Sequence, residues 1–143
     1  LQHELPATGT VLEISSGTGE HAVFFAPRLA PRQWLPSDPN SIARASIEAW
    51  REHLPADNLL APIALDVCDS IWAVEQPTLT ASLQDHFQQH PIWAIVNINM
   101  IHIAPWSACL GLLAGAERLL PIGVILYLYG PFQIQGQHTA PSN

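Results

Sequence analysis

A short apolar run that ends in a glycine turn limits this chain to few folds. The segment TVLEI at residues 10–14 is typical of a buried strand, and SSGTG at residues 15–19 follows it directly. Residues 20–29 then carry apolar side chains at near-helical spacing, and Pro27 shortens that helix. The order of strand, tight turn and helix predicts the first crossover unit of a parallel sheet.

The same alternation continues along the chain. Further strands are predicted at residues 33–36, 59–67, 92–98 and 124–129, and further helices at residues 41–53, 80–90 and 105–119. Asn40 or Ser41 is suited to cap the second helix. Strands that alternate with helices indicate an α/β fold with a doubly wound, mostly parallel sheet. Such sheets bind ligands beyond the carboxyl ends of their strands, so we look for function in those loops.

Length and composition fit a single domain over residues 1–143. The chain is 48% hydrophobic and only 12% charged, so it can bury a proper core. Five arginines and no lysine stand against twelve acidic residues, which gives a formal net charge of -7. A protein with this charge would repel a phosphate backbone, and we therefore expect no nucleic-acid partner.

The chain carries no pattern of a membrane or secreted protein. Its longest apolar stretches fall short of the roughly 18 residues that suggest a membrane span, and no signal-peptide pattern opens the sequence. We expect a cytoplasmic protein without a membrane partner. Cys68 and Cys109 lack the paired spacing of zinc ligands, so we expect no metal site.

The glycine turn is suited to a nucleotide-like ligand. Gly17 and Gly19 let the backbone pass close to a ligand, and the helix that follows points its N–H groups at the same place. Together with Ala22 they also satisfy the dinucleotide-binding pattern with alanine in third place. A turn that serves only packing is the alternative interpretation.

Acidic residues follow two of the other predicted strands. Asp38 lies about 20 residues beyond the glycine turn, where a carboxylate can accept hydrogen bonds from both ribose hydroxyls. Alternatively, Asp38 caps the next helix. Asp66 and Asp69 end the third predicted strand, where an acid could accept a hydrogen bond from the exocyclic amine of adenine.

Glu13 separates two cofactor classes. An acid at the end of the first strand is unfavourable beside a pyrophosphate, but it suits a cationic ligand with a free amino group. No arginine or lysine lies between Leu1 and Ala26, so nothing basic is available there to pair with phosphate. This charge pattern favours S-adenosylmethionine over a nicotinamide dinucleotide.

These residues resemble the class I S-adenosylmethionine-dependent methyltransferases, through VLEISSGTG at residues 11–19, Asp38, Asp66 and NMIH at residues 99–102. More closely, residues 99–106 and 126–132 resemble the small methyltransferase-like family known as domain of unknown function 938. The resemblance covers nearly the whole chain. It departs from the broader superfamily at Ser15, which stands where a first glycine is common.

The resemblance implies a Rossmann-like fold and a cofactor site formed by Glu13, Ser15, Gly17, Gly19, Asp38, Asp66, Val67 and Asn99. The first four would surround the methionine part of S-adenosylmethionine. Asp38 would bind the ribose, Asp66 and Val67 would lie beside the adenine, and Asn99 would lie near the methyl group.

Two residues are candidates for catalysis. His102 is a candidate base, although a single histidine in an apolar segment is often structural. Tyr129 belongs to an acceptor site that we place between residues 99–106 and 129–138. The neutral polar side chains there favour a small, uncharged or cationic acceptor, unless residues 130–143 are simply a polar tail.

The sequence therefore predicts a methyltransferase that acts on a small molecule. A nicotinamide-dependent oxidoreductase and a non-catalytic cofactor-binding or interaction module are the alternatives. Related methyltransferases follow the fifth strand with a helix and two antiparallel strands, and nothing after Phe132 resembles them, so we expect these C-terminal strands to be missing. The last strand would then have an unpaired edge, and the chain should either form a homodimer or lose stability.

Overall fold

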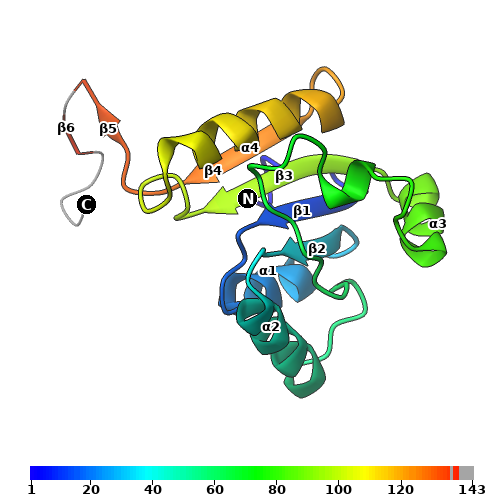
Figure 1. Cartoon of the computed structure of the whole chain (residues 1–143). Coiled ribbons are helices and arrows are strands. Elements are labelled where there is room, and N and C mark those ends of the chain that lie inside the picture. The colour runs from blue at the N-terminus through cyan, green and yellow to red at the C-terminus, as the bar shows by residue number, and fades with distance from the viewer. Residues whose placement is uncertain (136, 139–143) are drawn as a thin grey trace.

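A computed structural model describes residues 1–135 and 137–138, and it shows a four-stranded parallel sheet with helices on both faces (Figure 1). The strands are β1 (Thr10–Ile14), β2 (Gln33–Ser37), β3 (Ile92–Ile98) and β4 (Ile125–Tyr129), in the order β2-β1-β3-β4. All three pairings are parallel. The predicted doubly wound, Rossmann-like fold is thereby confirmed.

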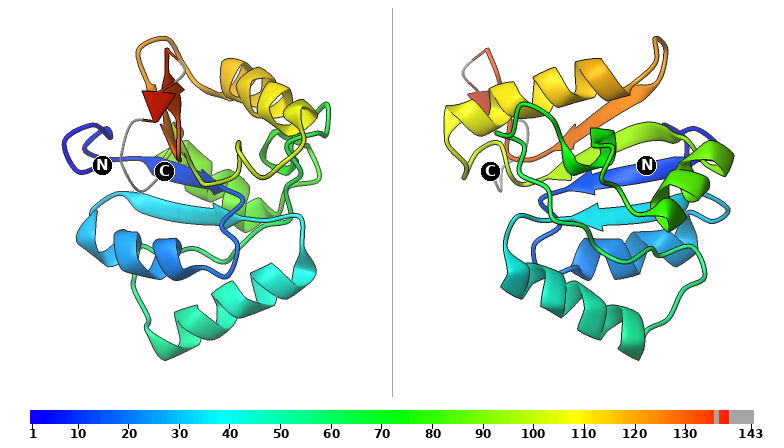
Figure 2. Two further views of the ribbon diagram at one scale, coloured as in Figure 1. Left: turned by 90° about the vertical axis from the view of Figure 1, so that its left-hand side faces the viewer. Right: turned by 45° about the vertical axis from the view of Figure 1, so that its right-hand side comes forward.

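The helices form two layers, one on each face of the sheet. Helices α1 (Glu20–Arg28) and α2 (Ser41–His53) lie on one face, and α3 (Ala81–Gln89) and α4 (Trp106–Leu119) lie toward the other (Figure 2). A short 3₁₀ helix, η1 (Ala73–Glu75), precedes α3. Asn40 caps α2, because its side chain accepts a hydrogen bond from the Ile42 N–H at 2.8 Å.

The core consists of two apolar clusters that the sheet separates. Leu12 and Ile14 of β1 pack with Leu112 of α4, whereas Val11 packs with Ala22 and Ala26 of α1. Alternate side chains of β1 are therefore buried on opposite faces, as expected of a strand covered on both sides. On the α1 face, β3 and β4 present Ile98, Tyr127 and Tyr129.

The prediction of a regular strand at residues 59–67 is wrong. The segment runs parallel to β2 but forms only two isolated bridges, Trp34 with Leu59 and Ser37 with Ile63. The Leu60 N–H donates to the Trp34 carbonyl at 2.9 Å, but a regular ladder would next use the N–H groups of residues 36 and 62. Both are prolines, which have no N–H, so the ladder is interrupted there.

The last main strand is an edge strand. In the described part of the chain β4 pairs only with β3, as the sequence predicts. After Phe132 the chain does form an antiparallel pair, β5 (Gln133–Ile134) and β6 (Gln137–His138), which the sequence analysis did not expect. These two-residue strands form a sheet of their own, so they do not extend the main sheet. Residues 136 and 139–143, which belong to the predicted polar tail, lie outside the described part.

The N-terminal segment is fixed to the fold by a buried arginine. The Arg32 guanidinium donates hydrogen bonds to the backbone carbonyls of Gln2, Leu5 and Pro6. The Leu5 side chain is buried in the α1 cluster. These contacts hold Leu1 on the α1 face of the sheet.

Candidate functional site

A cavity of about 450 Å³ lies at the carboxyl ends of the strands. It is lined by residues of the glycine turn, the start of α1, the end of β2 and the loop after β3: Ser15, Ser16, Gly17, Thr18, Glu20, His21, Asp38, Ile98, Asn99, Met100, Ile103 and Ala104. We call it the cofactor cavity. Its position is where doubly wound sheets bind their ligands, and its volume lies within the range of small-molecule sites. Four of the eight predicted cofactor residues line it: Ser15, Gly17, Asp38 and Asn99.

The glycine turn presents its backbone to this cavity at Gly17. Gly17 has a φ of 57°, and a Cβ added to it would meet no atom within 4 Å, so it would project into open space. Ser15 has a φ of 56°, which is unusual for a residue with a side chain and explains why glycine is common at this position. Its hydroxyl donates to the Met100 sulfur at 3.1 Å, which connects the turn to the loop after β3.

Gly19 has a different role from Gly17. A Cβ at Gly19 would lie 2.8 Å from Ile47 Cγ1 and 3.1 Å from Ile47 Cα, and the glycine does not line the cavity. Its φ of 93° adds a second reason for glycine. Close packing of the turn against α2 accounts for Gly19, which is the interpretation that the sequence left as an alternative.

Asp38 connects the turn to the end of β2. It is 7% exposed, and its Oδ2 accepts a hydrogen bond from the Gly17 N–H at 3.0 Å. Its Oδ1 accepts one from the Asn40 N–H at 2.9 Å. Asn40, and not Asp38, supplies the cap of α2. A carboxylate has about four acceptor positions, so Asp38, which lines the cavity, keeps capacity for two further donors.

Glu13 is buried behind the turn and does not line the cavity. Its Oε2 accepts a hydrogen bond from the Trp34 indole N–H at 2.9 Å, and its Oε1 has no partner among the described residues. Burial raises the pKa of Glu13 to about 7 because the charged form loses its hydration. The acids that do line the cavity are Glu20 and Asp38.

Asp66 and Val67 are also absent from the cavity lining. The exposed Asp66 accepts a hydrogen bond from the Cys68 N–H at 2.9 Å, which closes a local turn. Val67 is 6% exposed and packs in the core cluster on the α4 face. The sequence placed both at the end of the predicted strand 59–67, but their described contacts are local or structural.

The loop after β3 brings Asn99 to the cavity and leaves His102 outside it. Asn99 has a φ of 63°, and its N–H donates to the Tyr129 carbonyl at 2.9 Å. His102 is exposed and lines no cavity that we identify in the described residues. Its Nδ1 lies 3.1 Å from the position of a Cβ added to Gly130. Tyr129 lines a neighbouring cavity and is 60% exposed.

Sequence reasoning missed His21 and Ile98 as site residues. Both line the cofactor cavity, His21 from the first turn of α1 and Ile98 as the last residue of β3. The position of His21, two residues after the glycine turn, is a signal that could have identified it. Ile98 reads as one more core residue of an apolar strand.

Sequence reasoning also missed a pair of histidines that are four residues apart. His86 lies on α3 and His90 follows it, with ring centroids 5.1 Å apart. The Thr10 hydroxyl donates to the His90 carbonyl at 2.6 Å and lies 3.0 Å from His86 Nε2. Burial and the nearby His90 lower the pKa of His86. This pair fixes α3 to the start of β1, away from the cofactor cavity.

Two other features are absent from the described residues. No group of three or more histidine, cysteine or acidic side chains is arranged to hold a metal ion in this part of the chain. Within the same residues, no helix has the length and apolar character needed to cross a membrane.

Comparison with known proteins yields one family and many similar folds. A family model described as "Protein of unknown function (DUF938)" matches residues 1–143. A structure of PKMT2 from Rickettsia typhi in complex with AdoHcy is similar with a TM-score of 0.61 and 18% identity, over 84% of this chain and 20% of that one.

Two bacterial S-adenosylmethionine-dependent methyltransferases, both solved with S-adenosylhomocysteine, are similar as well. The protein from Geobacter sulfurreducens has a TM-score of 0.57 and 16% identity, over 89% of this chain and 43% of that one. The protein from Thiobacillus denitrificans has a TM-score of 0.57 and 17% identity, over 87% and 42%. The chain thus spans less than half the length of these structures, and the likeness establishes the class I methyltransferase fold.

Proposed function

The chain belongs to the DUF938 family of proteins of unknown function, and from its site we propose that it is an S-adenosylmethionine-dependent methyltransferase acting on a small molecule. One observation carries the proposal. The cofactor cavity at the carboxyl ends of β1, β2 and β3 is lined by two acids and by no basic side chain other than His21. That lining suits a cationic nucleoside ligand better than a pyrophosphate.

The residues present fit this cofactor. At Gly17 the turn leaves open the space that a Cβ would occupy, so a ligand can approach the backbone there. The N-cap of α1 has no side-chain hydrogen bond, which leaves the first N–H groups of the helix free to bind a carboxylate. Glu20 lies beside these groups and offers a carboxylate to an ammonium group.

The remaining positions suit the nucleoside part. The free acceptor positions of Asp38 would bind the ribose hydroxyls, and Asn99, Met100 and Ile103 would border the rest of the ligand. S-adenosylmethionine, when bound, supplies an electrophilic methyl group on a positively charged sulfur. The protein then has to align the acceptor with that group, exclude water and accept a proton where the acceptor carries one.

Our assignment of individual residues differs from the sequence expectation at several positions. We retain Ser15, Gly17, Asp38 and Asn99 as cofactor-binding residues and add Glu20. We assign Glu13 and Gly19 to support of the turn, and Asp66 and Val67 to the fold. Tyr129 remains a candidate for acceptor binding, but His102 lies outside both cavities, so we do not retain it as the base.

Replacing Asp38 by alanine is expected to weaken binding of S-adenosylhomocysteine by about 1 to 3 kcal/mol, because ribose hydroxyls would lose their acceptor in a mostly buried site. Isothermal calorimetry measures the effect, with circular dichroism as a check that the variant is folded. Asp57→Ala is the matched control, since Asp57 is exposed and lines neither cavity. Unchanged affinity in folded Asp38→Ala would remove Asp38 from the site.

The two glycines of the turn should respond differently to valine. Both substitutions strain the backbone, because φ is positive at each glycine. Gly17→Val is expected to abolish S-adenosylhomocysteine binding in the folded protein, because its side chain would also project into the cavity. Gly19→Val should lower the melting temperature further than Gly17→Val does, because its Cβ also meets Ile47. Thermal melts with and without ligand distinguish them. Ligand binding by folded Gly17→Val would contradict this account of the turn.

The alternative functions predict different results in binding and turnover experiments. A nicotinamide-dependent oxidoreductase should bind NADH, which changes its fluorescence when bound. A non-catalytic binding module should bind S-adenosylmethionine without converting it to S-adenosylhomocysteine over long incubation with candidate acceptors.

A further inference from the structure

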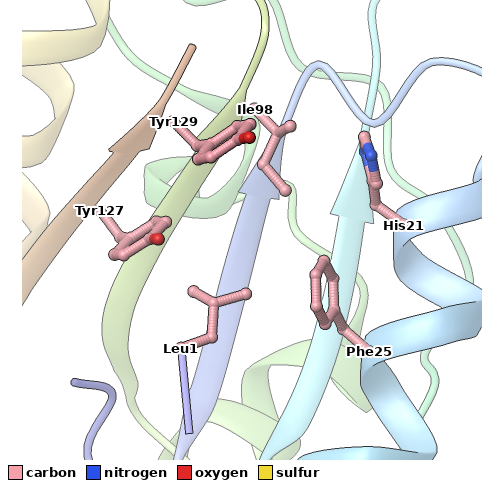
Figure 3. Close-up of a pocket in the computed structure, with 6 residues that line it drawn as sticks. All are labelled: Leu1, His21, Phe25, Ile98, Tyr127 and Tyr129. Carbon is pink, nitrogen blue, oxygen red and sulfur yellow. The ribbon is translucent and has the colours of Figure 1, made fainter. Parts of the chain in front are cut away.

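A second cavity, of about 270 Å³, lies on the α1 face of the sheet beside the cofactor cavity. Figure 3 shows its six lining residues: Leu1, His21, Phe25, Ile98, Tyr127 and Tyr129. We propose that this acceptor cavity binds the methyl acceptor, and that the acceptor is an uncharged, planar aromatic compound with a hydroxyl group. The inference rests on the proposed methyltransferase function and names its substrate class.

The two cavities are neighbours, because His21 and Ile98 line both of them. The two cavities therefore adjoin at these two side chains. Direct transfer needs this arrangement, since the reacting atoms must approach within about 3.5 Å in the correct alignment. The cavity is near the lower end of small-molecule sites in size, so it suits a compound of one or two rings.

The lining selects for an aromatic compound. Phe25 of α1 lies on one side of the cavity, and Tyr127 and Tyr129 of β4 lie on the other (Figure 3). A planar ring between them can stack on these aromatic side chains. No aspartate, glutamate, arginine or lysine lines the cavity, so a charged acceptor would lose its hydration without gaining an ionic partner. An uncharged molecule avoids that cost.

Three polar groups in the lining can bind and activate a hydroxyl. They are the hydroxyls of Tyr127 and Tyr129 and the imidazole of His21, and none of them forms a hydrogen bond to another described residue. His21 stacks on Phe25 with ring centroids 6.2 Å apart, which places the imidazole at the junction of the two cavities.

This placement makes His21 the acceptor of the proton. The acceptor oxygen forms a bond to the methyl carbon, and the carbon–sulfur bond breaks with its electron pair left on sulfur. The hydroxyl proton passes to an imidazole nitrogen of His21, which later releases it to solvent. The products are a methyl ether and a neutral thioether, so atoms and charge balance.

The test uses 2-naphthol as probe, with naphthalene-2-carboxylate as a charged counterpart of similar shape. Isothermal calorimetry in the presence of saturating S-adenosylhomocysteine should show that the protein binds 2-naphthol at least tenfold more tightly than the carboxylate. Tyr129→Ala and Phe25→Leu should each weaken 2-naphthol binding at least tenfold and leave S-adenosylhomocysteine affinity unchanged. Phe24→Leu, on the outer side of α1, is the matched control and should change neither.

The rate of methyl transfer tests the role of His21 as the proton acceptor. His21→Gln should slow formation of 2-methoxynaphthalene about 100-fold at saturating 2-naphthol, whereas the exposed-histidine control His53→Gln should not. At saturating concentration, a more acidic naphthol that is already ionised at the assay pH should be methylated by His21→Gln at nearly the rate of the unchanged protein, because it needs no base, although its charge makes it bind more weakly than 2-naphthol.

The outcomes distinguish a failure of the acceptor assignment from a failure of the proposed methyltransferase function. Binding of S-adenosylhomocysteine without 2-naphthol binding, or 2-naphthol binding that Tyr129→Ala and Phe25→Leu leave intact, overturns the acceptor assignment alone. Failure of the unchanged protein to bind S-adenosylhomocysteine overturns the proposed function. Tighter binding of the carboxylate than of 2-naphthol would contradict the selection for an uncharged acceptor.

Discussion

Replacing Gly115 by alanine is expected to lower the free energy of unfolding by about 3 kcal/mol, which is at the upper end of the usual cost of overpacking a core. Gly115 is in the middle of α4, and an added Cβ would lie 1.9 Å from Trp72 Cζ2. Trp72 is fully buried, and its indole N–H donates to the Val67 carbonyl, so the ring cannot move aside freely. The higher helix propensity of alanine, about 1 kcal/mol, offsets only part of this clash.

A double-mutant cycle in urea tests the cause. In a Trp72→Phe background the smaller ring should relieve the clash, so the loss caused by Gly115→Ala should shrink by at least 1 kcal/mol. An equal loss in both backgrounds would contradict the proposed contact. The same face of α4 also packs closely on the Val67 carbonyl at Gly111.

Replacing Glu13 by glutamine is expected to stabilise the protein by about 2 kcal/mol at pH 8 and to have little effect at pH 5. The pKa of Glu13 rises from 4.5 to about 7 on folding. Between these values the folded state binds more protons than the unfolded state, so the free energy of unfolding falls as the pH rises. At 1.36 kcal/mol per pKa unit, the free energy of unfolding above pH 7 is about 3 kcal/mol lower than it is below pH 4.5. Glutamine places an amide N–H without a hydrogen-bond partner in the core, and this cost reduces the net stabilisation to about 2 kcal/mol.

Urea titrations at pH 5, 6, 7 and 8 measure this linkage. The difference between the variant and the unchanged protein should grow across the range, and Glu4→Gln, at an exposed residue, should show no such trend. A difference that is constant with pH would show that Glu13 does not titrate in this range. Unchanged S-adenosylhomocysteine affinity in Glu13→Gln would support the assignment of Glu13 to support of the turn.

Most of the fold can be predicted from the sequence because local residue patterns indicate where its helices and strands begin and end. Helix α2 has the predicted bounds, since a capping asparagine precedes it and a clear apolar face follows. Strands β1 and β3 also match residue for residue. The segment at residues 59–67 has the composition of a strand, but Pro36 and Pro62 block its ladder with β2. The strand prediction fails because prolines of two neighbouring segments face each other. The sequence of one segment alone does not show which residues of the other segment it will face.

The candidate site could be predicted only where residues lie directly at strand ends. Gly17, Asp38 and Asn99 meet in one cavity because parallel strands end at the same edge of the sheet. Glu13 belongs to the same motif, but side chains alternate along β1 and its carboxylate points into the α1 side of the core, against Trp34. The acceptor cavity joins α1 to β4, two elements distant in sequence, so no local pattern could indicate it.

Thermal unfolding with S-adenosylhomocysteine and with NADH tests the central claim most directly. S-adenosylhomocysteine at 100 times its dissociation constant should add about 2.7 kcal/mol to the free energy of unfolding and raise the melting temperature. The rise should be lost in Gly17→Val, and NADH at the same concentration should produce none. A melting temperature that rises with NADH and stays constant with S-adenosylhomocysteine would contradict the account.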